Sequence, residues 1–572
     1  MCGILGYEGA LQATPLIFKG LKQLSYRGYD SWGICAQTKK GLQTFKRVGD
    51  ITKSNEPKFD STKAIGHTRW ATHGKVTQKN AHPHLNESGT IAVVHNGIIE
   101  NADDLRLALE DEGYKFKSET DTEVIPHLLD YFAKRYDDHT ALLKTLKHLK
   151  GSYAFLALLK GRLAFARDGS PLVIGLSNSG KFISSDIPSF LHHTRKTIVL
   201  EDGDWGFADE DRIYSGKEIV SRPARIESWD VEVAKKGTYP HFMLKEIEEQ
   251  QMTIRKALNQ DGRIKIAADL LSRSEVYILG CGTSYNTGAI ASYELAKAGI
   301  RAIPSLASEF EPHLPFINED SIIIALSQSG ETKDVIDAVR EAKKKQAKII
   351  SIVNTPGSTL ARGADIHIPM KSGPEICVLS TKSATAQLAI LSLLTHEIEN
   401  KSPDLLREAA ACAPHVIAQT KRVAKQLAKK LKDTRSIFTI GRGPLAPLAR
   451  EAALKIKEVS YIHAEGMPAG ELKHGPIALI EPGVPVIVFA DSNTRTLTIS
   501  NALEVKARGA YVIGIDSKNH PAYDTHIQIP DIEEATPMLA LLPIQLLSYY
   551  LALERGCDPD KPRNLAKSVT VR

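Results

Sequence analysis

Short apolar runs separated by polar turns mark the first third of the chain. Residues 91–94 and 153–159 are apolar runs of strand length, so we predict that both form buried strands. Between them, residues 122–136 carry apolar side chains at helical spacing, which predicts an amphipathic helix. The pattern breaks into polar and turn-forming residues at 223–239. We therefore place a domain boundary there, ahead of a helical stretch that starts near Phe242.

From about residue 274 the pattern changes to apolar strands that alternate with helices, which predicts doubly wound parallel sheets. This region also repeats itself. Three segments recur in order at offsets of 161 or 162 residues: 276–280 at 437–441, 349–354 at 511–516, and 366–369 at 527–530. One match between buried strands could be chance, but three in order predict two copies of one domain.

Loops rich in hydroxyl groups follow the strands of the first copy, where an open parallel sheet binds its ligands. These loops contribute Thr283, Ser284, Ser327, Gln328, Ser329, Thr332 and Ser380. Hydroxyls and free backbone amides at a helix N-terminus suit a phosphate, although Ser and Thr are also ordinary helix caps. Three such loops in one domain favour a phosphorylated ligand. The Gly-Lys-Ser/Thr loop of P-loop nucleotide sites is absent from the sequence.

The second copy has residues 490–493, Ala-Asp-Ser-Asn, in place of the Ser-Gln-Ser loop. It carries titratable groups instead. Glu451, Lys455 and Glu458 share one face of a predicted helix by their i, i+4, i+7 spacing. A polar segment, 463–469, follows and is interpreted as a loop. The stripe is either a solvated row of ion pairs or, with His474 nearby, a set of groups for moving protons beside a carbonyl.

Composition narrows the class of protein. The 572 residues should form three or four domains, and the net charge of +6 comes without a basic block interleaved with aromatics, so nucleic acid is not an expected partner. We see neither an apolar run of membrane-span length nor a signal peptide. Six scattered cysteines without a Cys-x-x-Cys pair argue against zinc and disulfides and for a reducing cytoplasm, and no metal ligand cluster is visible.

Cys2 is a candidate nucleophile. If Met1 is removed, one residue carries both a thiol and a free α-amine, and the amine can accept the thiol proton near neutrality. Taken alone, a cysteine at this position is more often an accident. The motifs downstream reverse that judgement.

Several motifs carry a resemblance to a known family. The segments 2–4, 26–31, 67–74, 95–101 and 118–123 resemble the glutaminase half of the glutamine–fructose-6-phosphate aminotransferase (isomerizing) family, also called the glucosamine-6-phosphate synthases. The hydroxyl loops and the chain end at 564–571 resemble its synthase half. The resemblance covers essentially the whole chain. The motifs of the first half alone would indicate only an amidotransferase with an N-terminal nucleophile.

The resemblance implies a fold and a set of domain boundaries. An αββα domain of the N-terminal-nucleophile (Ntn) hydrolase class should span 1–237, followed by a linker over 238–250. Two doubly wound sugar isomerase (SIS) domains should follow at 251–412 and 413–560, and a tail over 561–572 should close the sugar site. In the family one histidine of the site comes from the neighbouring subunit, which implies a homodimer, and we expect neither a cofactor nor a metal.

The resemblance assigns roles in the glutaminase half. Cys2 would attack the carboxamide of glutamine, Asn96 and the backbone amide of Gly97 would form the oxyanion hole, Arg69 would bind the α-carboxylate, and Asp121 would bind the α-ammonium. The glutamine site would also include Trp70, Thr72 and His73. Other interpretations stay open: Arg69 as an ion-pair partner, Trp70 as plain core, and Asn96-Gly97 as a type I′ turn.

In the synthase half, Ser327, Gln328, Ser329 and Thr332 would bind the sugar phosphate, with further contacts from Thr283, Ser284, Val378 and Ser380. Lys567 would form a Schiff base with the ketone of fructose 6-phosphate, and Glu458 would carry the proton between C1 and C2. Lys455 and His474 would assist proton transfer and ring opening, with His474 supplied by the neighbouring subunit.

These roles predict synthesis of glucosamine 6-phosphate and glutamate from fructose 6-phosphate and glutamine, with ammonia kept from water and sugar binding activating the glutaminase. Two alternatives remain. One is an amidotransferase that acts on a different keto-sugar phosphate. The other is a sugar-phosphate sensor with a silent glutaminase, which would have no use for so complete a catalytic set.

Overall fold

The computed structural model describes residues 2–71, 74–227, 236–272 and 274–570. Thr72 and His73, which the sequence places in the glutamine site, lie outside the described residues, as does part of the expected boundary at 223–239. The chain forms two compact units. The first comprises Met1–Ala234 with Ala566–Arg572, and the second comprises Lys235–Leu565.

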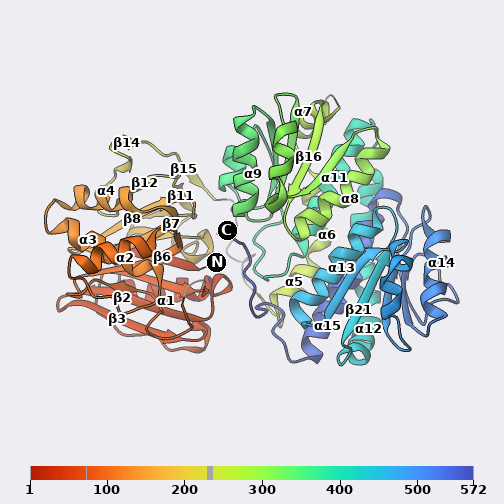
Figure 1. The fold of residues 1–572 in the computed structure, drawn as a ribbon, viewed down its shortest axis with the longest axis horizontal. Coiled ribbons are helices and arrows are strands. Elements are labelled where there is room, and N and C mark those ends of the chain that lie inside the picture. Colours follow the sequence, from red (N-terminus) through yellow and green to blue (C-terminus); the bar gives the residue numbers. More distant parts are fainter. Residues whose placement is uncertain (1, 72–73, 228–235, 273, 571–572) are drawn as a thin grey trace. The chain divides into compact units, whose positions relative to one another are not determined.

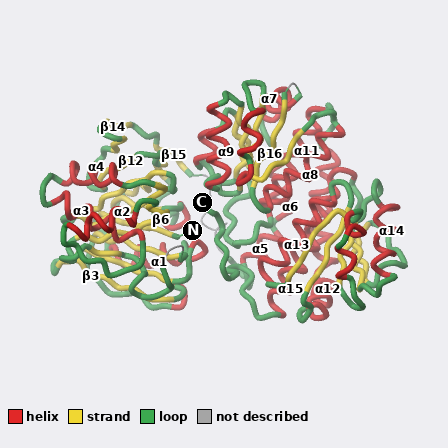
Figure 2. Tube along the Cα trace, in the orientation of Figure 1, coloured by secondary structure: helices red, strands yellow, loops and turns green. Residues whose placement is uncertain are grey.

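Two antiparallel sheets form the first unit (Figures 1 and 2). The first sheet has the order β15 (Ala224–Ile226), β11 (Lys196–Val199), β9 (Val173–Ser177), β10 (Gly180–Ser184), β1 (Gly3–Gly9), β4 (Lys63–Arg69), β2 (Ser31–Thr38), β3 (Gly41–Val48). The second sheet has the order β14 (Glu218–Val220), β13 (Ile213–Ser215), β12 (Asp204–Phe207), β8 (Arg162–Asp168), β7 (Gly151–Leu159), β6 (Ile91–Ile99), β5 (His84–Leu85).

Alternation along the strands builds four layers, because successive side chains point to opposite faces of a sheet. In β6, Ala92 and Val94 pack between the two sheets, whereas Ile91 and Val93 pack on the outer face. Helices α2 (Ala102–Asp111), α3 (Val124–Ala133) and α4 (Asp138–His148) cover that outer face. Helix α1 (Ala13–Gln23) covers the outer face of the other sheet. The expected αββα fold is confirmed, and both predicted strands and the predicted helix are present.

The second unit contains two five-stranded parallel sheets of the same order. One is β17 (Ala302–Leu306), β16 (Glu275–Gly280), β18 (Ser321–Ser327), β19 (Lys348–Val353), β20 (Ile366–Pro369). The other is β22 (His463–Pro468), β21 (Ser436–Gly441), β23 (Pro485–Phe489), β24 (Tyr511–Asp516), β25 (Thr525–Gln528). The identical order confirms that the repeats seen in the sequence are two copies of one fold.

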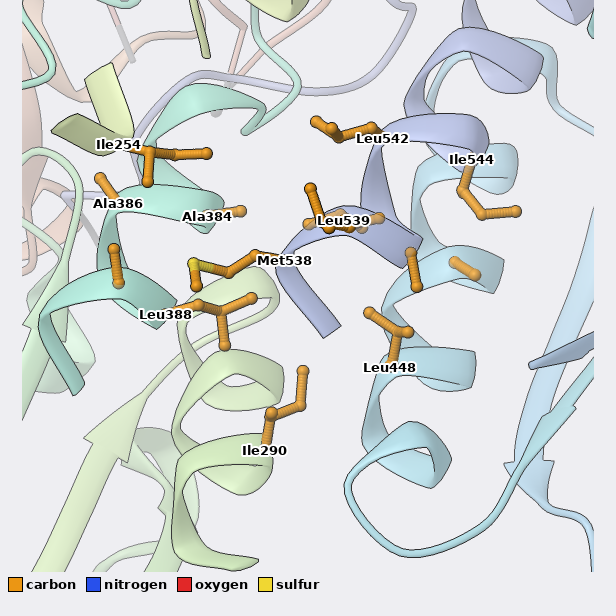
Figure 3. Close-up of a cluster of buried hydrophobic side chains, with 14 of the residues drawn as sticks. Ile254, Ile290, Ala384, Ala386, Leu388, Leu448, Met538, Leu539, Leu542 and Ile544 are labelled. Atoms are coloured by element: carbon orange, nitrogen blue, oxygen red, sulfur yellow. The ribbon is translucent and has the colours of Figure 1, made fainter. Parts of the chain in front are cut away.

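Helices surround the two sheets (Figure 1): α5 (Phe242–Glu248), α6 (Gln250–Leu258), α7 (Arg263–Leu271), α8 (Thr283–Lys297), α9 (Lys333–Lys344), α10 (Thr359–Gly363), α11 (Lys382–Ile398), α12 (Asp404–Leu431), α13 (Leu445–Ser460), α14 (Arg495–Lys506), α15 (Thr536–Glu554). Figure 3 shows Met538 and Leu539 of α15 packed between helices of the two copies. In the described chain, Glu533–Glu554 is long and apolar enough to cross a membrane, but its apolar window is 94% buried, as in a core helix.

One local expectation is wrong. The polar segment 463–469, interpreted as a loop, contains the edge strand β22, which pairs in parallel with β21. Only Ala464 and Met467 of this strand are buried. A Cβ at Gly466 would lie 2.4 Å from the Ala449 carbonyl oxygen, so the glycine lets α13 approach the strand closely.

Candidate functional site

Cys2 lies directly before β1, with its side chain half-buried. The backbone N–H of Trp70 donates to Cys2 Sγ at 3.2 Å, and the thiol lies 3.3 Å from the Trp70 carbonyl oxygen. Burial raises the pKa of the Cys2 thiol, whereas the Trp70 amide and the guanidinium groups of Arg69 and Arg27 lower it. Because burial prevails, this thiol needs a base beside it to react near neutral pH.

Two side chains fix the backbone of the nucleophile. Asn96 Nδ2 donates to the Cys2 carbonyl oxygen at 2.9 Å, and Arg27 Nε donates to it at 3.2 Å. Arg27 forms an ion pair with Asp186 at 2.8 Å, and the Tyr26 hydroxyl donates to the same carboxylate at 2.6 Å. Cys2 is therefore held by residues from three distant segments of the chain.

Gly97 can be no other residue. It lies with Asn96 inside β6, opposite Tyr153 of β7. Its φ is +124°, and a Cβ there would lie 1.9 Å from the Ser152 carbonyl oxygen. Since both residues lie in mid-strand, the alternative interpretation of Asn96-Gly97 as a hairpin turn is wrong.

Arg69 and Asp121 carry opposite charges, and Arg69 lies close enough to the Cys2 thiol to lower its pKa. Arg69, at the end of β4, is 3% exposed and donates to the Lys75 and Gly74 carbonyl oxygens at 3.2 and 3.3 Å. Burial lowers the pKa of Arg69, and Asp121 is among the acidic groups that oppose this shift. Asp121 Oδ2 accepts from the Ile99 N–H at 2.8 Å, which ties it to the strand of Asn96 and Gly97. The half-buried ring of Trp70 meets the ring of Tyr29 edge-on.

Four buried histidines connect these segments. His67 stacks on His82 with ring centroids 3.9 Å apart, and His84 meets His82 edge-on. His82 Nδ1 accepts from the His95 N–H at 3.3 Å, and His67 Nε2 lies 3.0 Å from the His95 carbonyl oxygen. Burial lowers the pKa of His67 to about 3 and those of His82 and His84 well below the usual value. Within the described ranges, no group of three or more His, Cys, Asp or Glu side chains is arranged to hold a metal ion.

We expect acid to destabilise the first unit through these histidines. The pKa values of His67, His82 and His84 are depressed in the folded state, so between pH 6.5 and about 3 the unfolded chain binds more protons than the folded one. As the pH is lowered through this range, the free energy of unfolding should fall by about 1.4 kcal/mol per pH unit for each such histidine. Thermal unfolding across this range measures the slope, and His67→Asn should reduce it. An unchanged slope in that variant would contradict the assignment.

Two of the three titratable side chains in the stripe on α13 are fully buried. Lys455 Nζ lies 3.2 Å from Glu451 Oε1 and 2.8 Å from Glu458 Oε2. The side chains of Glu451 and Lys455 are fully buried, whereas that of Glu458 is 20% exposed. Burial alone would lower the pKa of Lys455, but the two carboxylates outweigh it and raise the pKa. The solvated-stripe interpretation is therefore wrong. Lys455 is a fixed cation, and Glu458 is the member of this triad that reaches solvent.

Hydrogen bonds connect the triad to the domain that contains the first parallel sheet. Lys455 Nζ donates to Thr283 Oγ1 at 2.9 Å, and Thr283 Oγ1 donates to Glu451 Oε1 at 2.9 Å. Asn286 Nδ2 donates to Glu451 Oε2 at 2.8 Å. Thr283 and Asn286 belong to α8 of the first copy, so one polar network spans both copies.

The Ser327–Thr332 loop forms a tight turn before α9. Ser327 Oγ accepts from the Gly330 N–H at 2.9 Å and lies 3.0 Å from Thr332 Oγ1, and Ser329 Oγ accepts from the Glu331 N–H at 3.1 Å. Gly330 has a φ of +66°, and a Cβ there would lie 2.0 Å from Ser358 Oγ. The hydroxyls thus act as caps, yet they also gather at the N-terminal end of α9, as an anion site requires.

The other expected sugar contacts are placed less uniformly. Ser284 Oγ accepts from Gln387 Nε2 at 3.0 Å, and the Ser380 carbonyl oxygen lies 3.5 Å from Lys455 Nζ. His474 is exposed at the end of a short 3₁₀ turn, Glu471–His474. Lys567 is half-buried in the segment Ala566–Arg572, which belongs to the first unit.

Comparison with known proteins decides the family. A family model described as a glutamine amidotransferase domain matches residues 67–192, and one described as an SIS domain matches residues 269–397 and 430–555. A glutamine–fructose-6-phosphate aminotransferase [isomerizing] of Sulfurisphaera tokodaii is 42% identical over 599 aligned residues, with all of both chains covered. A protein of the same name from Clostridium tetani is 43% identical over 614, again with full coverage. The chain belongs to the glutamine–fructose-6-phosphate aminotransferase (isomerizing) family.

Solved structures agree with this family at the second unit. The C-terminal domain of glucosamine-fructose-6-phosphate aminotransferase from Francisella tularensis matches with a TM-score of 0.52 and 32% identity, covering 57% of this chain and 99% of that one. Glucosamine-6-phosphate deaminase from Thermotoga maritima matches with a TM-score of 0.51 and 26% identity, covering 58% and 100%. The expectation of two SIS domains after an amidotransferase domain is confirmed.

Sequence reasoning missed two groups of residues in this candidate site. Asp186, the partner of Arg27, stands in no recognisable motif and lies 159 residues away along the chain. The buried histidines left a weak signal, since His82 and His84 flank Pro83 and precede the strand of His95. Five histidines between residues 67 and 95 could have indicated a ring cluster.

Proposed function

We propose that the protein converts D-fructose 6-phosphate and L-glutamine to D-glucosamine 6-phosphate and L-glutamate, the first step towards UDP-N-acetylglucosamine. The observation that carries this proposal is the pairing, in one chain of this family, of the Cys2 cluster with a buried Glu451–Lys455–Glu458 triad bonded to the hydroxyl loops. A sensor that only bound sugar phosphate would need neither cluster.

In the glutaminase half, Cys2 Sγ attacks the carboxamide carbon of glutamine after Met1 is removed, and its own α-amine takes the thiol proton. Asn96 Nδ2 has a second N–H beyond the one bound to Cys2. That N–H and the backbone N–H of Gly97 stabilise the oxyanion, each by roughly 3 kcal/mol. Arg69 binds the α-carboxylate and Asp121 the α-ammonium. Collapse of the adduct expels ammonia, and water then releases glutamate from the thioester.

In the synthase half, the Ser327–Thr332 loop holds the phosphate, and Lys567 forms a Schiff base at the C2 ketone with loss of water. Ammonia displaces the lysine and leaves the C2 imine. Glu458 removes a proton from C1 and returns one to C2, so the ketose imine becomes the aldose amine. Lys455 pairs with Glu458 at 2.8 Å and holds this carboxylate in place. The exposed His474 reaches the site of a partner subunit in a cytoplasmic homodimer and assists ring opening.

The decisive assay incubates the full chain, with Cys2 verified as its first residue, with glutamine and fructose 6-phosphate. We expect glucosamine 6-phosphate and glutamate in equal amounts. Glutamate without amino sugar would move the acceptor to another keto-sugar phosphate, which a panel of such sugars would then identify. Neither product would contradict the proposal and favour a sensor.

A further inference from the structure

The chain passes between its two compact units twice, after Ala234 and after Leu565. Helix α5 follows the first passage, and the segment 558–561 precedes the second. Both lie in the second unit, and both are bonded to one loop of the first SIS copy. This loop, residues 374–381, runs from the end of the sheet to α11 and carries two of the expected sugar contacts, Val378 and Ser380.

Asp560 joins the second passage to the first. Its two carboxylate oxygens accept from the backbone N–H groups of Phe242 and Met243 at 2.8 Å each, which caps the start of α5. Its own carbonyl oxygen accepts from the Val378 N–H at 3.2 Å. One residue thus holds the linker helix and the sugar-site loop together.

Glu246 joins the linker helix to the same loop from the other side. It is 1% exposed, and its Oε1 accepts from the Ile376 N–H at 2.6 Å and the Cys377 N–H at 3.2 Å. Beyond the loop, the fully buried Lys382 forms an ion pair with Glu249 at 2.8 Å. The linker region is therefore bonded to both the loop and the start of α11.

The loop is also closed on itself. Glu375 Oε1 accepts from the Thr381 and Ser383 N–H groups at 3.0 Å each. Buried carboxylates thus accept several of the loop's backbone N–H groups, which ties the loop to α5, and the Val378 N–H ties the loop to the 558–561 segment. A ligand that fixes Val378 and Ser380 would fix both chain passages with them.

We propose that Glu246 and Asp560 are positioning residues through which sugar phosphate bound at the 374–381 loop sets the rate of glutamine hydrolysis in the other unit. The inference rests on the proposed function. Neither residue need touch a substrate, because each acts through the backbone of the loop. The coupling needs a connection that both chain passages share, and this loop is such a connection.

The test uses the full chain with Glu246→Gln and Asp560→Asn, which keep an acceptor oxygen but lose the charge. The matched control is Glu248→Gln on the same helix, whose carboxylate pairs with Lys421 and the Tyr239 hydroxyl. We expect the stimulation of glutaminase by fructose 6-phosphate to fall at least about fivefold in the two variants, with the sugar-free rate unchanged. The KM for the sugar in ammonia-dependent synthesis should rise, and the control should match the wild type.

Full stimulation in variants that unfold at the wild-type temperature would overturn the proposal. So would an equal loss of glutaminase rate with and without sugar, which marks a merely structural role. If the variants do not fold, hydrogen exchange in the wild type decides: fructose 6-phosphate should slow exchange at Phe242, Met243, Ile376 and Cys377, and unchanged exchange would refute the coupling. A wild type that makes neither glutamate nor amino sugar would refute the proposed function itself, and this coupling with it.

Discussion

Cys2→Ala is expected to abolish glutamine-dependent synthesis while leaving ammonia-dependent synthesis intact. The variant has no nucleophile for the carboxamide, so glutamine use should fall by roughly 10³-fold or more. Its polar partners, the Trp70 amide and Asn96, stay in place, so the fold should persist. The measurement is glucosamine 6-phosphate formed from fructose 6-phosphate with either glutamine or an ammonium salt, at alkaline pH where free ammonia is present.

Cys35→Ala is the control for this experiment. Cys35 is buried in β2, and burial raises the pKa of its thiol to about 12, so it has no thiolate to offer. This variant should use both nitrogen sources at the wild-type rate. Glutamine-dependent synthesis that survives in Cys2→Ala would contradict the role of Cys2.

Glu458→Gln should lower ammonia-dependent synthesis by roughly 10²–10⁴-fold, because an amide cannot carry the proton between C1 and C2. Stability should change little. The Glu458 side chain is 20% exposed, and Lys455 keeps its second ion pair with Glu451. The readouts are kcat for amino-sugar formation and the unfolding temperature.

Glu451→Gln is the matched variant, since it removes a charge from the same lysine. Glu451 is fully buried, and its two carboxylate oxygens accept hydrogen bonds from Thr283 and Asn286. In the glutamine variant an NH₂ group would replace one of these acceptors and would lie against a hydrogen-bond donor. We expect a loss of about 1–3 kcal/mol in unfolding free energy, with isomerisation retained. If Glu451→Gln lost more activity than Glu458→Gln, the roles of the two carboxylates would be reversed.

Local pattern predicted most of the fold. Buried strands and amphipathic helices have periods that can be read along the chain, and the repeats predicted two sheets of equal order. Strand β22 was not predicted, because it is an edge strand in which only two side chains are buried. Its pairing comes from the neighbouring β21, and no local apolar pattern marks it.

The residues of the candidate site also differ in whether the sequence alone can point to them. Residues within motifs, such as Asn96 and Glu458, could be proposed for the site from the sequence, because their residue types and their neighbours along the chain point to them. Asp186, Glu246 and Asp560 could not, because each bonds to atoms brought near by the fold alone, through an ion pair or backbone N–H groups. Every residue except proline has a backbone N–H, so the residue type does not show which N–H groups bind a carboxylate.

The network between Thr283 and Lys455 has a consequence for how such a chain can evolve. The first repeat keeps the hydroxyl loops and the second keeps the acid and the lysine, so neither repeat holds a whole site. A duplicated ancestor would have been free to lose in each copy the groups that the other copy retained, and such a loss would make the two copies depend on each other. A substitution on one side of this contact requires a compensating substitution on the other side. We therefore expect the two repeats to evolve together.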